Sequence, residues 1–188
     1  MKRKIIALAL GMALSFGATA CGSEAPATGS PATPQTSTVE AGPTLQQEIL
    51  TFVGDSLPSI AGDRDRAVLL YNDYFTAAGN EKDSDKWMGT LSQEALPKYD
   101  TYLSNLKALK TVNPEVGSLK ELYLASAQLQ RDAIQLVVDA IKNADSTILD
   151  QAQKKVDESK AKLQEYNDML KTLCEQNSIT LEGISEQK

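Results

Sequence analysis

Two long stretches of helical periodicity in the second half of the chain constrain its fold most. Between Asp145 and Gln176, apolar and small residues alternate at three- and four-residue spacing without a slip. These residues are Leu149, Ala152, Val156, Ser159, Leu163, Tyr166, Leu170 and Leu173. Such a heptad pattern predicts a helix that packs nearly antiparallel along a neighbour. The stretch from about Asn113 to Asn143 carries two adjacent apolar stripes, so we expect its helix to be packed on more than one side.

The same periodicity occurs in three earlier segments, residues 44–57, 63–78 and 84–110. Pro58 should interrupt the first segment, and Pro97 should kink or break the third, because proline lacks a backbone donor and clashes with the preceding turn. No segment shows sustained strand-like alternation. We therefore expect an all-α fold, an up-and-down antiparallel bundle of four main helices, with or without a separate N-terminal helix. This domain should span residues 44–188.

Local signals mark where the helices begin and end. Thr44 and Gln47 fit a capping box, and Asn113 followed by Pro114 fits an N-cap and first helical residue. Ser118 with Glu121 is an alternative start for the same helix. Gly79-Asn80 is a good helix stop, since both residues tolerate a left-handed conformation. Asp145 is the expected cap of the last helix.

The first 20 residues are typical of a secretory signal peptide. Lys2, Arg3 and Lys4 precede a short apolar run from Ile5 to Ala13, which is too short to cross a bilayer. Residues 21–43 are rich in Pro, Ser, Thr, Ala and Gly and low in large apolar residues. We expect this segment to be a disordered linker.

The small residues Ala18, Thr19 and Ala20 directly precede Cys21. This arrangement resembles the lipobox of bacterial lipoproteins, and the helical body resembles their uncharacterised helical members without matching a specific family. The resemblance implies that Cys21 becomes the N-terminus and carries a diacylglycerol with acyl chains such as palmitate. It also implies a bacterial cell membrane location, on the extracytoplasmic face. The alternatives are cleavage after Ala20 to give a soluble secreted protein, and a retained N-terminal helix.

Composition argues against several kinds of chemistry. The chain has no histidine, so Ser-His-Asp and Cys-His catalysis are excluded, and no cysteine cluster or Gly-rich phosphate loop occurs. Asp83-Ser84-Asp85 begins like a calcium loop but lacks its glycine and closing glutamate, which favours an N-cap cluster. We therefore expect no enzymatic activity, no cofactor and no metal site.

Charge argues against two kinds of partner. Without residues 1–20 the chain keeps 16 basic and 25 acidic residues, a net charge of −9. Such a surface disfavours nucleic acids and anionic lipid headgroups as direct partners.

Aromatic residues are the best candidates for a binding site. Five of them lie on or beside the predicted core stripes: Tyr71, Tyr74, Trp87, Tyr99 and Tyr102. They either line a pocket or partner contact, or serve as ordinary core packing with tyrosine hydroxyls at the rim.

Two further features have competing interpretations. The alternating charges of Asp63-Arg64-Asp65-Arg66, at an expected helix start, are either a docking patch or solvated residues that complement the helix dipole. Cys174 is either a small apolar residue near the end of the last helix or a thiol that reacts or forms an intermolecular disulfide.

From the sequence we expect a lipid-anchored extracytoplasmic interaction module that binds a protein or cell-envelope partner. The signal, the linker and the lack of catalytic groups favour it. The alternative is a small-ligand-binding lipoprotein with an apolar cleft between helices, near Tyr71, Tyr74, Tyr99 and Tyr102.

Overall fold

The computed structural model describes residues 42–77 and 83–181. The predicted signal peptide, Cys21 and most of the linker lie outside the described residues, as does the predicted stop at Gly79-Asn80. The elements are α1 (Leu45–Thr51), η1 (Phe52–Ser56), α2 (Leu57–Thr76), α3 (Ser84–Thr90), η3 (Leu91–Ala95), α4 (Leu96–Ala108), α5 (Pro114–Lys142) and α6 (Ile148–Gln176). The described residues contain no strand, which confirms the all-α prediction.

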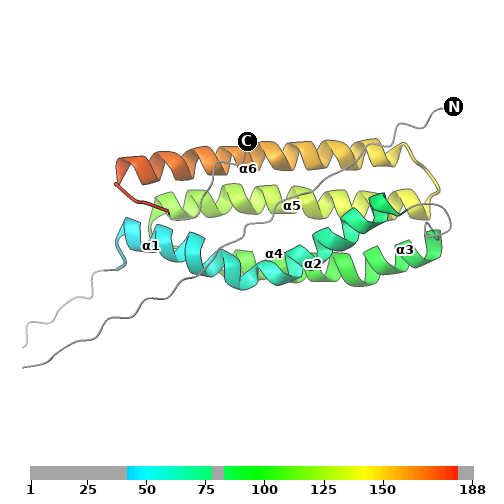
Figure 1. The fold of residues 1–188 in the computed structure, drawn as a ribbon, viewed down its shortest axis with the longest axis horizontal. Coiled ribbons are helices and arrows are strands. Elements are labelled where there is room, and N and C mark those ends of the chain that lie inside the picture. Colours follow the sequence, from blue (N-terminus) through cyan, green and yellow to red (C-terminus); the bar gives the residue numbers. More distant parts are fainter. Residues whose placement is uncertain (1–41, 78–82, 182–188) are drawn as a thin grey trace, which may run out of the picture.

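Four long helical rods run up and down along one axis (Figure 1). The first rod is α1–η1–α2, the second is α3–η3–α4, and α5 and α6 are the third and fourth. The predicted up-and-down bundle of four main helices is therefore confirmed. Within the described residues, no helix combines the length and apolar character that crossing a membrane requires.

The predicted interruption at Pro58 is wrong, because the chain stays helical from Leu45 to Thr76. The π-helical turn η1 lies directly before Leu57 and Pro58, and the Leu57 N–H donates to the carbonyl of Phe52, five residues back. A π turn widens the backbone, which relieves the clash between the proline ring and the preceding turn. The separate N-terminal helix is therefore the first part of rod one.

The second rod repeats this arrangement at Pro97. The π turn η3 precedes Leu96 and Pro97, and the Leu96 N–H donates to the carbonyl of Leu91. The helix therefore does not break at the proline. In both rods the sequence Leu-Pro follows a π turn directly.

The α5–α6 hairpin is the most closely packed part of the bundle, as the heptad pattern predicts. At its centre, the Ser126 and Ser159 hydroxyls lie 2.9 Å apart, and each can donate to the other residue's backbone carbonyl, 3.0 Å away. Both serines are almost fully buried. Small side chains with satisfied hydroxyls let the two backbones approach closely here.

Several predicted caps are confirmed. Thr44 and Gln47 form a capping box, Asp83 accepts hydrogen bonds from the backbone of Asp85 and Lys86, and Asn113 is the N-cap before Pro114. The prediction for Asp145 is wrong, because α6 begins at Ile148 and its N-cap is Thr147. The Asp145 carboxylate instead accepts from the backbone N–H and hydroxyl of Thr147, in the turn before the helix.

The loop between α4 and α5 is held by two charged side chains of opposite sign. Glu48 of α1 is buried and accepts hydrogen bonds from the backbone N–H groups of Val112 and Asn113, at the start of α5. Lys120 of α5 donates to the carbonyls of Lys107 and Leu109, at the end of α4. An anion at a helix N-terminus and a cation at a C-terminus both complement the helix dipoles.

Candidate functional site

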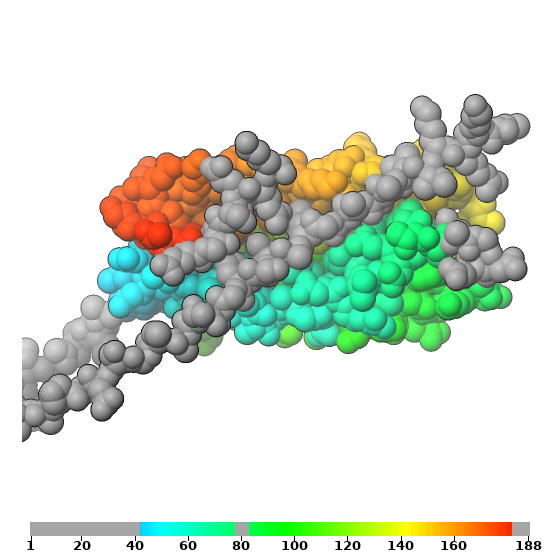
Figure 2. Space-filling model, viewed as in Figure 1, coloured from blue at the N-terminus to red at the C-terminus, as the bar shows by residue number. Residues whose placement is uncertain are grey.

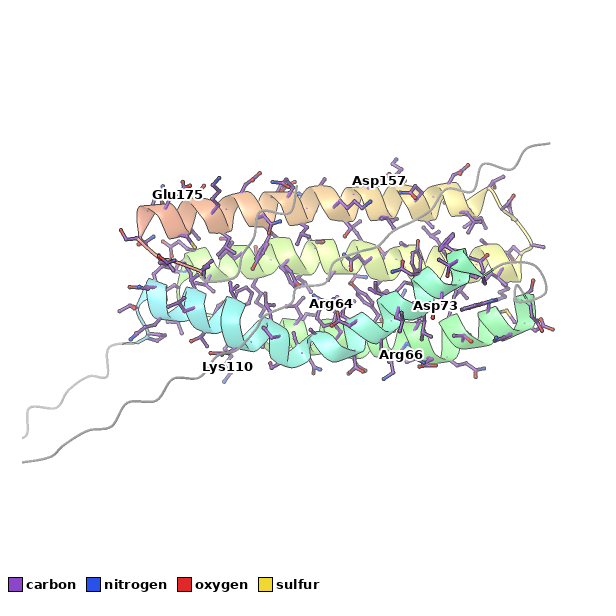
Figure 3. The ribbon with its side chains drawn as sticks, in the orientation of Figure 1. Arg64, Arg66, Asp73, Lys110, Asp157 and Glu175 are labelled. Atoms are coloured by element: carbon purple, nitrogen blue, oxygen red, sulfur yellow. The ribbon has the colours of Figure 1, made fainter. Side chains whose placement is uncertain are left out.

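A layer of polar side chains crosses the middle of the bundle, and we call it the polar layer. Its main members are Arg64, Tyr99, Tyr102, Tyr123 and Gln130. Among the described residues, Arg64 is its only charged member with a buried side chain (Figure 3). Arg64 is 9% exposed. It continues the inward stripe of α2, at regular spacing between Leu57, Ile60, Ala67 and Tyr71. Its Nη1 donates to the hydroxyl of Tyr123 on α5, over 2.7 Å. A buried guanidinium needs such partners to offset its lost hydration.

The second rod contributes two tyrosines to this layer. The Tyr99 hydroxyl donates to Oε1 of the buried Gln130 over 2.6 Å, and the guanidinium carbon of Arg64 lies 5.8 Å from the centre of the Tyr102 ring. The Tyr99 and Tyr102 rings meet edge to face, with centroids 5.5 Å apart. Burial raises the pKa of both tyrosines well above the ordinary value, so their hydroxyls are protonated at neutral pH.

Arg64 keeps its charge in this environment. Burial opposes the charge, but Tyr123, Tyr102 and Asp65 outweigh it and hold the pKa of Arg64 above its ordinary value. Asp65 provides the only carboxylate in direct contact with Arg64 among the described residues.

A cavity of about 30 Å³ lies within this polar layer. All four rods line it: Arg64, Asp65 and Val68 from α2, Tyr99 and Tyr102 from α4, Tyr123, Ser126, Ala127 and Gln130 from α5, and Leu163 from α6. A single water needs roughly 10–15 Å³ by this measure, so the cavity has room for about two waters. It is too small for a whole organic ligand.

Ion pairs on the surface tie the rods together around this layer. Asp63 and Lys98 join α2 to α4 at 3.0 Å, and Arg66 of α2 meets Glu94 of η3 at 2.8 Å. The predicted location of the Asp63–Arg66 segment at a helix start is therefore wrong, because the segment lies in the middle of rod one. Its charges serve cross-rod pairing and the buried layer, and not the dipole of a helix end.

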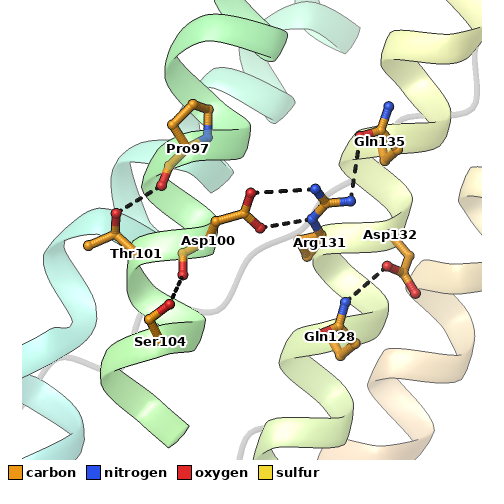
Figure 4. A network of polar contacts seen from close by, with 8 residues as sticks. All are labelled: Pro97, Asp100, Thr101, Ser104, Gln128, Arg131, Asp132 and Gln135. Carbon is orange, nitrogen blue, oxygen red and sulfur yellow. Dashed lines mark hydrogen bonds and ion pairs between the residues drawn. The ribbon is translucent and has the colours of Figure 1, made fainter. Parts of the chain in front are cut away.

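The same kind of pairing joins the second rod to the third (Figure 4). Arg131 of α5 and Asp100 of α4 form an ion pair with 2.9 Å between Nε and Oδ1. Because Arg131 also lies near the Gln135 amide oxygen, it is fixed in one orientation on this face. These pairs link neighbouring rods on the surface of the bundle.

A second feature is a groove of about 220 Å³ where α2 ends, α3 begins, and the α5–α6 turn lies. We call it the end groove. Tyr74 and Trp87 form one wall, and their rings meet edge to face with centroids 5.8 Å apart. Its other lining residues are Ser84, Ala140, Ile141, Ala144, Ser146 and Leu149.

The structure separates the five aromatic residues that the sequence grouped together. Tyr99 and Tyr102 belong to the polar layer, and Tyr74 and Trp87 to the end groove. Tyr71 lines neither feature. It is fully buried beside Phe75, and its hydroxyl has no hydrogen-bond partner among the described residues.

Three residues of the polar layer were missed by sequence reasoning: Arg64, Tyr123 as its acceptor, and Gln130. The signal for Arg64 was present, since it occupies the inward register of α2. Apart from the adjacent Asp65, its partners lie on other rods, with Tyr123 59 residues away, and no local pattern reveals them.

Cys174 is buried and forms no disulfide within the described residues. Burial raises the pKa of its thiol, with a smaller contribution from Glu175. A thiol with a raised pKa is a poor nucleophile, so this position suits packing better than reactivity.

The described residues contain no group of three or more His, Cys, Asp or Glu side chains placed to hold a metal ion. No protein-family model, no curated protein and no solved structure matches the chain. The assignment of a function therefore depends on the sequence signals and on the geometry of the polar layer and the end groove.

Proposed function

We propose that the protein is a lipid-anchored binding module on the extracytoplasmic face of a bacterial cell membrane. Its lipid is carried by Cys21, and its partner is an envelope protein that places an apolar side chain in the end groove. The single observation that carries this proposal is that the groove lies at the end of the bundle opposite the start of α1 (Figure 1).

The distance between the two ends supports this arrangement. The chain reaches the bundle at Leu45, and the third and fourth rods have 29 residues each. At 1.5 Å per residue such a helix is about 43 Å long. A body on a flexible linker is free to turn, so its far end can reach envelope partners well beyond the membrane surface.

The chemistry of the groove supports a protein partner. Six of its eight lining residues are aromatic or aliphatic, and Ser84 and Ser146 add polar groups. Aromatic residues with a polar rim are frequent at protein interfaces. At about 220 Å³ the groove is smaller than ordinary pockets for drug-sized ligands, which start at about 300 Å³. One large side chain of a partner is the occupant that we propose.

The proposal includes no catalytic role. The chain has no histidine, and its buried tyrosines have pKa values too high for proton transfer near neutral pH. The net negative charge after residue 20 also favours a protein partner over a nucleic acid.

Site-specific photo-cross-linking in intact cells tests the proposed partner site. A photoreactive phenylalanine analogue replaces Ser146, which is exposed and lines the end groove, or Lys110, which is exposed at the other end of the bundle (Figure 3). We expect a discrete cross-linked protein from position 146 only. Cross-links of equal strength from both positions, or from neither, would contradict the proposed partner site.

The anchor is tested separately by labelling cells with a palmitate analogue. We expect the label on the wild-type chain and none on Cys21→Ala, with the variant released from the membrane fraction. Unlabelled wild-type protein would refute the anchor and the argument from its position, while the cross-linking experiment would still test the groove itself.

A further inference from the structure

We infer that Arg64 and the central cavity form a binding site for a carboxylate group, with Asp65 as the internal group that the ligand displaces. This site lies in the middle of the bundle, away from the end groove, and does not depend on the proposed function. Three features of the molecule favour it: the guanidinium is fixed, its present acceptor is weakly held, and the cavity matches the size of one carboxylate.

The guanidinium is fixed by groups from two other rods. The Tyr123 hydroxyl accepts from Nη1 at 2.7 Å, and the Tyr102 ring lies against the guanidinium at 5.8 Å. Arg64 is only 9% exposed, so its side chain has little freedom. A rigid planar arginine is the residue best suited to bidentate recognition of a carboxylate, because little entropy is lost on binding.

The present acceptor of Arg64 has a different geometry. Both Nε and Nη2 donate to a single oxygen, Oδ1 of Asp65, at 2.9 and 2.7 Å. In a paired arrangement each nitrogen donates to its own carboxylate oxygen. Asp65 is the next residue along the same helix, and its side chain is 58% exposed. Because water already solvates most of this carboxylate, Asp65 can move outward at little cost.

The cavity beside Arg64 has the size and the lining that a carboxylate needs. Its volume of about 30 Å³ holds about two waters, which is close to the two oxygens of one carboxylate. Arg64, Tyr102, Tyr123 and Ser126 are among its lining residues, so polar side chains border the space.

The cavity lies where the first and fourth rods leave space between them. Within the described residues, α6 packs closely on α5 but has few close approaches to α2. Figure 2 shows α6 and α2 along opposite edges of this face of the molecule. Asp65 and Val68 of α2 and Leu163 of α6 line this side of the cavity. The rest of an acid could therefore remain outside while its carboxylate enters.

Acetate is the simplest probe, because it presents one carboxylate and a single methyl group. The experiment follows the side-chain Nε–H resonance of Arg64 by NMR in the full chain, in detergent, during titration with sodium acetate. Sodium chloride at equal ionic strength is the control. The chain has four arginines, so the resonance can be assigned by substitution. We expect a saturable shift with acetate and none with chloride.

Two matched variants sharpen the test. Asp65→Asn removes the internal competitor, and half-saturation should then need roughly threefold less acetate, the effect of an exposed ion pair. Asp63→Asn also removes a partly exposed, ion-paired carboxylate from the same turn, but Asp63 contacts Lys98 and not Arg64. Asp63→Asn should therefore bind acetate like the wild type.

Three outcomes would overturn the inference. The first is the absence of a saturable acetate shift in both the wild type and Asp65→Asn. The second is an equal shift of the Arg64 resonance with chloride. This would mean that the shift comes from ionic strength and not from a carboxylate bound in the cavity. The third is an equal gain in Asp63→Asn, which would indicate a general charge effect. None of these variants removes a buried group, so all should fold.

Discussion

The first two rods and the last two rods of the bundle are built differently. Rods one and two each contain a π turn followed by Leu-Pro, and are joined to each other by surface ion pairs such as Asp63 with Lys98. Rods three and four, α5 and α6, are uninterrupted and meet along a heptad seam with small buried residues at its centre. One bundle can therefore combine a pair of helices aligned by close packing, rods three and four, with a pair joined by specific polar contacts, rods one and two. The polar layer around Arg64 joins the two halves.

The largest change in stability should come from placing a bulky side chain in the interface between α5 and α6. Ser159→Leu places extra bulk where α5 and α6 are closest and removes the Ser159 hydroxyl, one of the two partners of the Ser126 hydroxyl. We expect a loss of about 3 kcal/mol in the free energy of unfolding, measured by urea denaturation.

Ser104→Leu is the matched control, because Ser104 is exposed on α4 in the other half. Its effect should stay within about 0.5 kcal/mol. Equal costs at both positions would mean that close packing does not distinguish the two halves.

The next effect concerns the layer that joins the halves. Tyr123→Phe removes the buried acceptor of Arg64, and should cost about 2 kcal/mol in the free energy of unfolding. Tyr71→Phe is the same chemical change at a buried hydroxyl that has no hydrogen-bond partner among the described residues. It should be neutral or stabilise the protein by about 1 kcal/mol. Thermal unfolding of the two variants tests this. A larger loss of stability in Tyr71→Phe than in Tyr123→Phe would contradict the described network.

The third prediction concerns Glu48, which ties rod one to the loop between rods two and three. Burial of this carboxylate would raise its pKa, but hydrogen bonds from Val112, Asn113 and the Asn113 amide outweigh burial and hold the pKa below 4.5. The stabilisation is therefore fully present above pH 4.5 and is lost as the pH falls through the lowered folded-state pKa. We expect a loss of about 1.5 kcal/mol from this contact at low pH.

The check is to measure the free energy of unfolding of the wild type and of Glu48→Gln between pH 7 and pH 2.5. The variant should be less stable at pH 7 and should lose less stability on acidification, because its amide does not titrate. Parallel pH curves for the two proteins would show that Glu48 is not the group responsible.

The smallest effect should be a gain in the α5–α6 turn. Ala144 has a φ of 51°, and the backbone there forms a Schellman motif, in which the Asp145 N–H donates to the Ala140 carbonyl. Ala144→Gly removes the steric cost of this left-handed conformation and should stabilise the protein by about 1 kcal/mol. Ala161→Gly, on the exposed face of α6, should instead destabilise it by about 1 kcal/mol. Two changes of the same sign, measured by thermal unfolding, would contradict the assigned turn.

Much of the fold was predictable because its signals are local. The heptad of α6 and the broad apolar face of α5 each depend on residues within one helix. The capping box at Thr44 and the N-cap at Asn113 depend on residues within one turn. The prediction at Asp145 failed because the N-cap is Thr147, two residues later. The prediction at Pro58 failed for another reason. A proline signals a conflict in the backbone, but a π turn can resolve that conflict when packing on neighbouring rods holds the helix together.

The candidate sites were less predictable, because they join residues from separate rods. The sequence grouped five aromatic residues by type, and the structure divides them between the polar layer, the end groove and the core. Arg64 shared the inward register of α2, yet its charge suggested solvent exposure.

Periodicity and capping signals in the sequence determined the helical class, most helix boundaries and the heptad seam, because these depend on neighbours within a few residues. Only the tertiary structure decided that Arg64 is buried, that the two prolines sit within continuous rods, and that Tyr74 and Trp87 share a groove. A buried charge is stable only when groups from other rods hydrogen-bond to it, and here the acceptor, Tyr123, is 59 residues away along the chain.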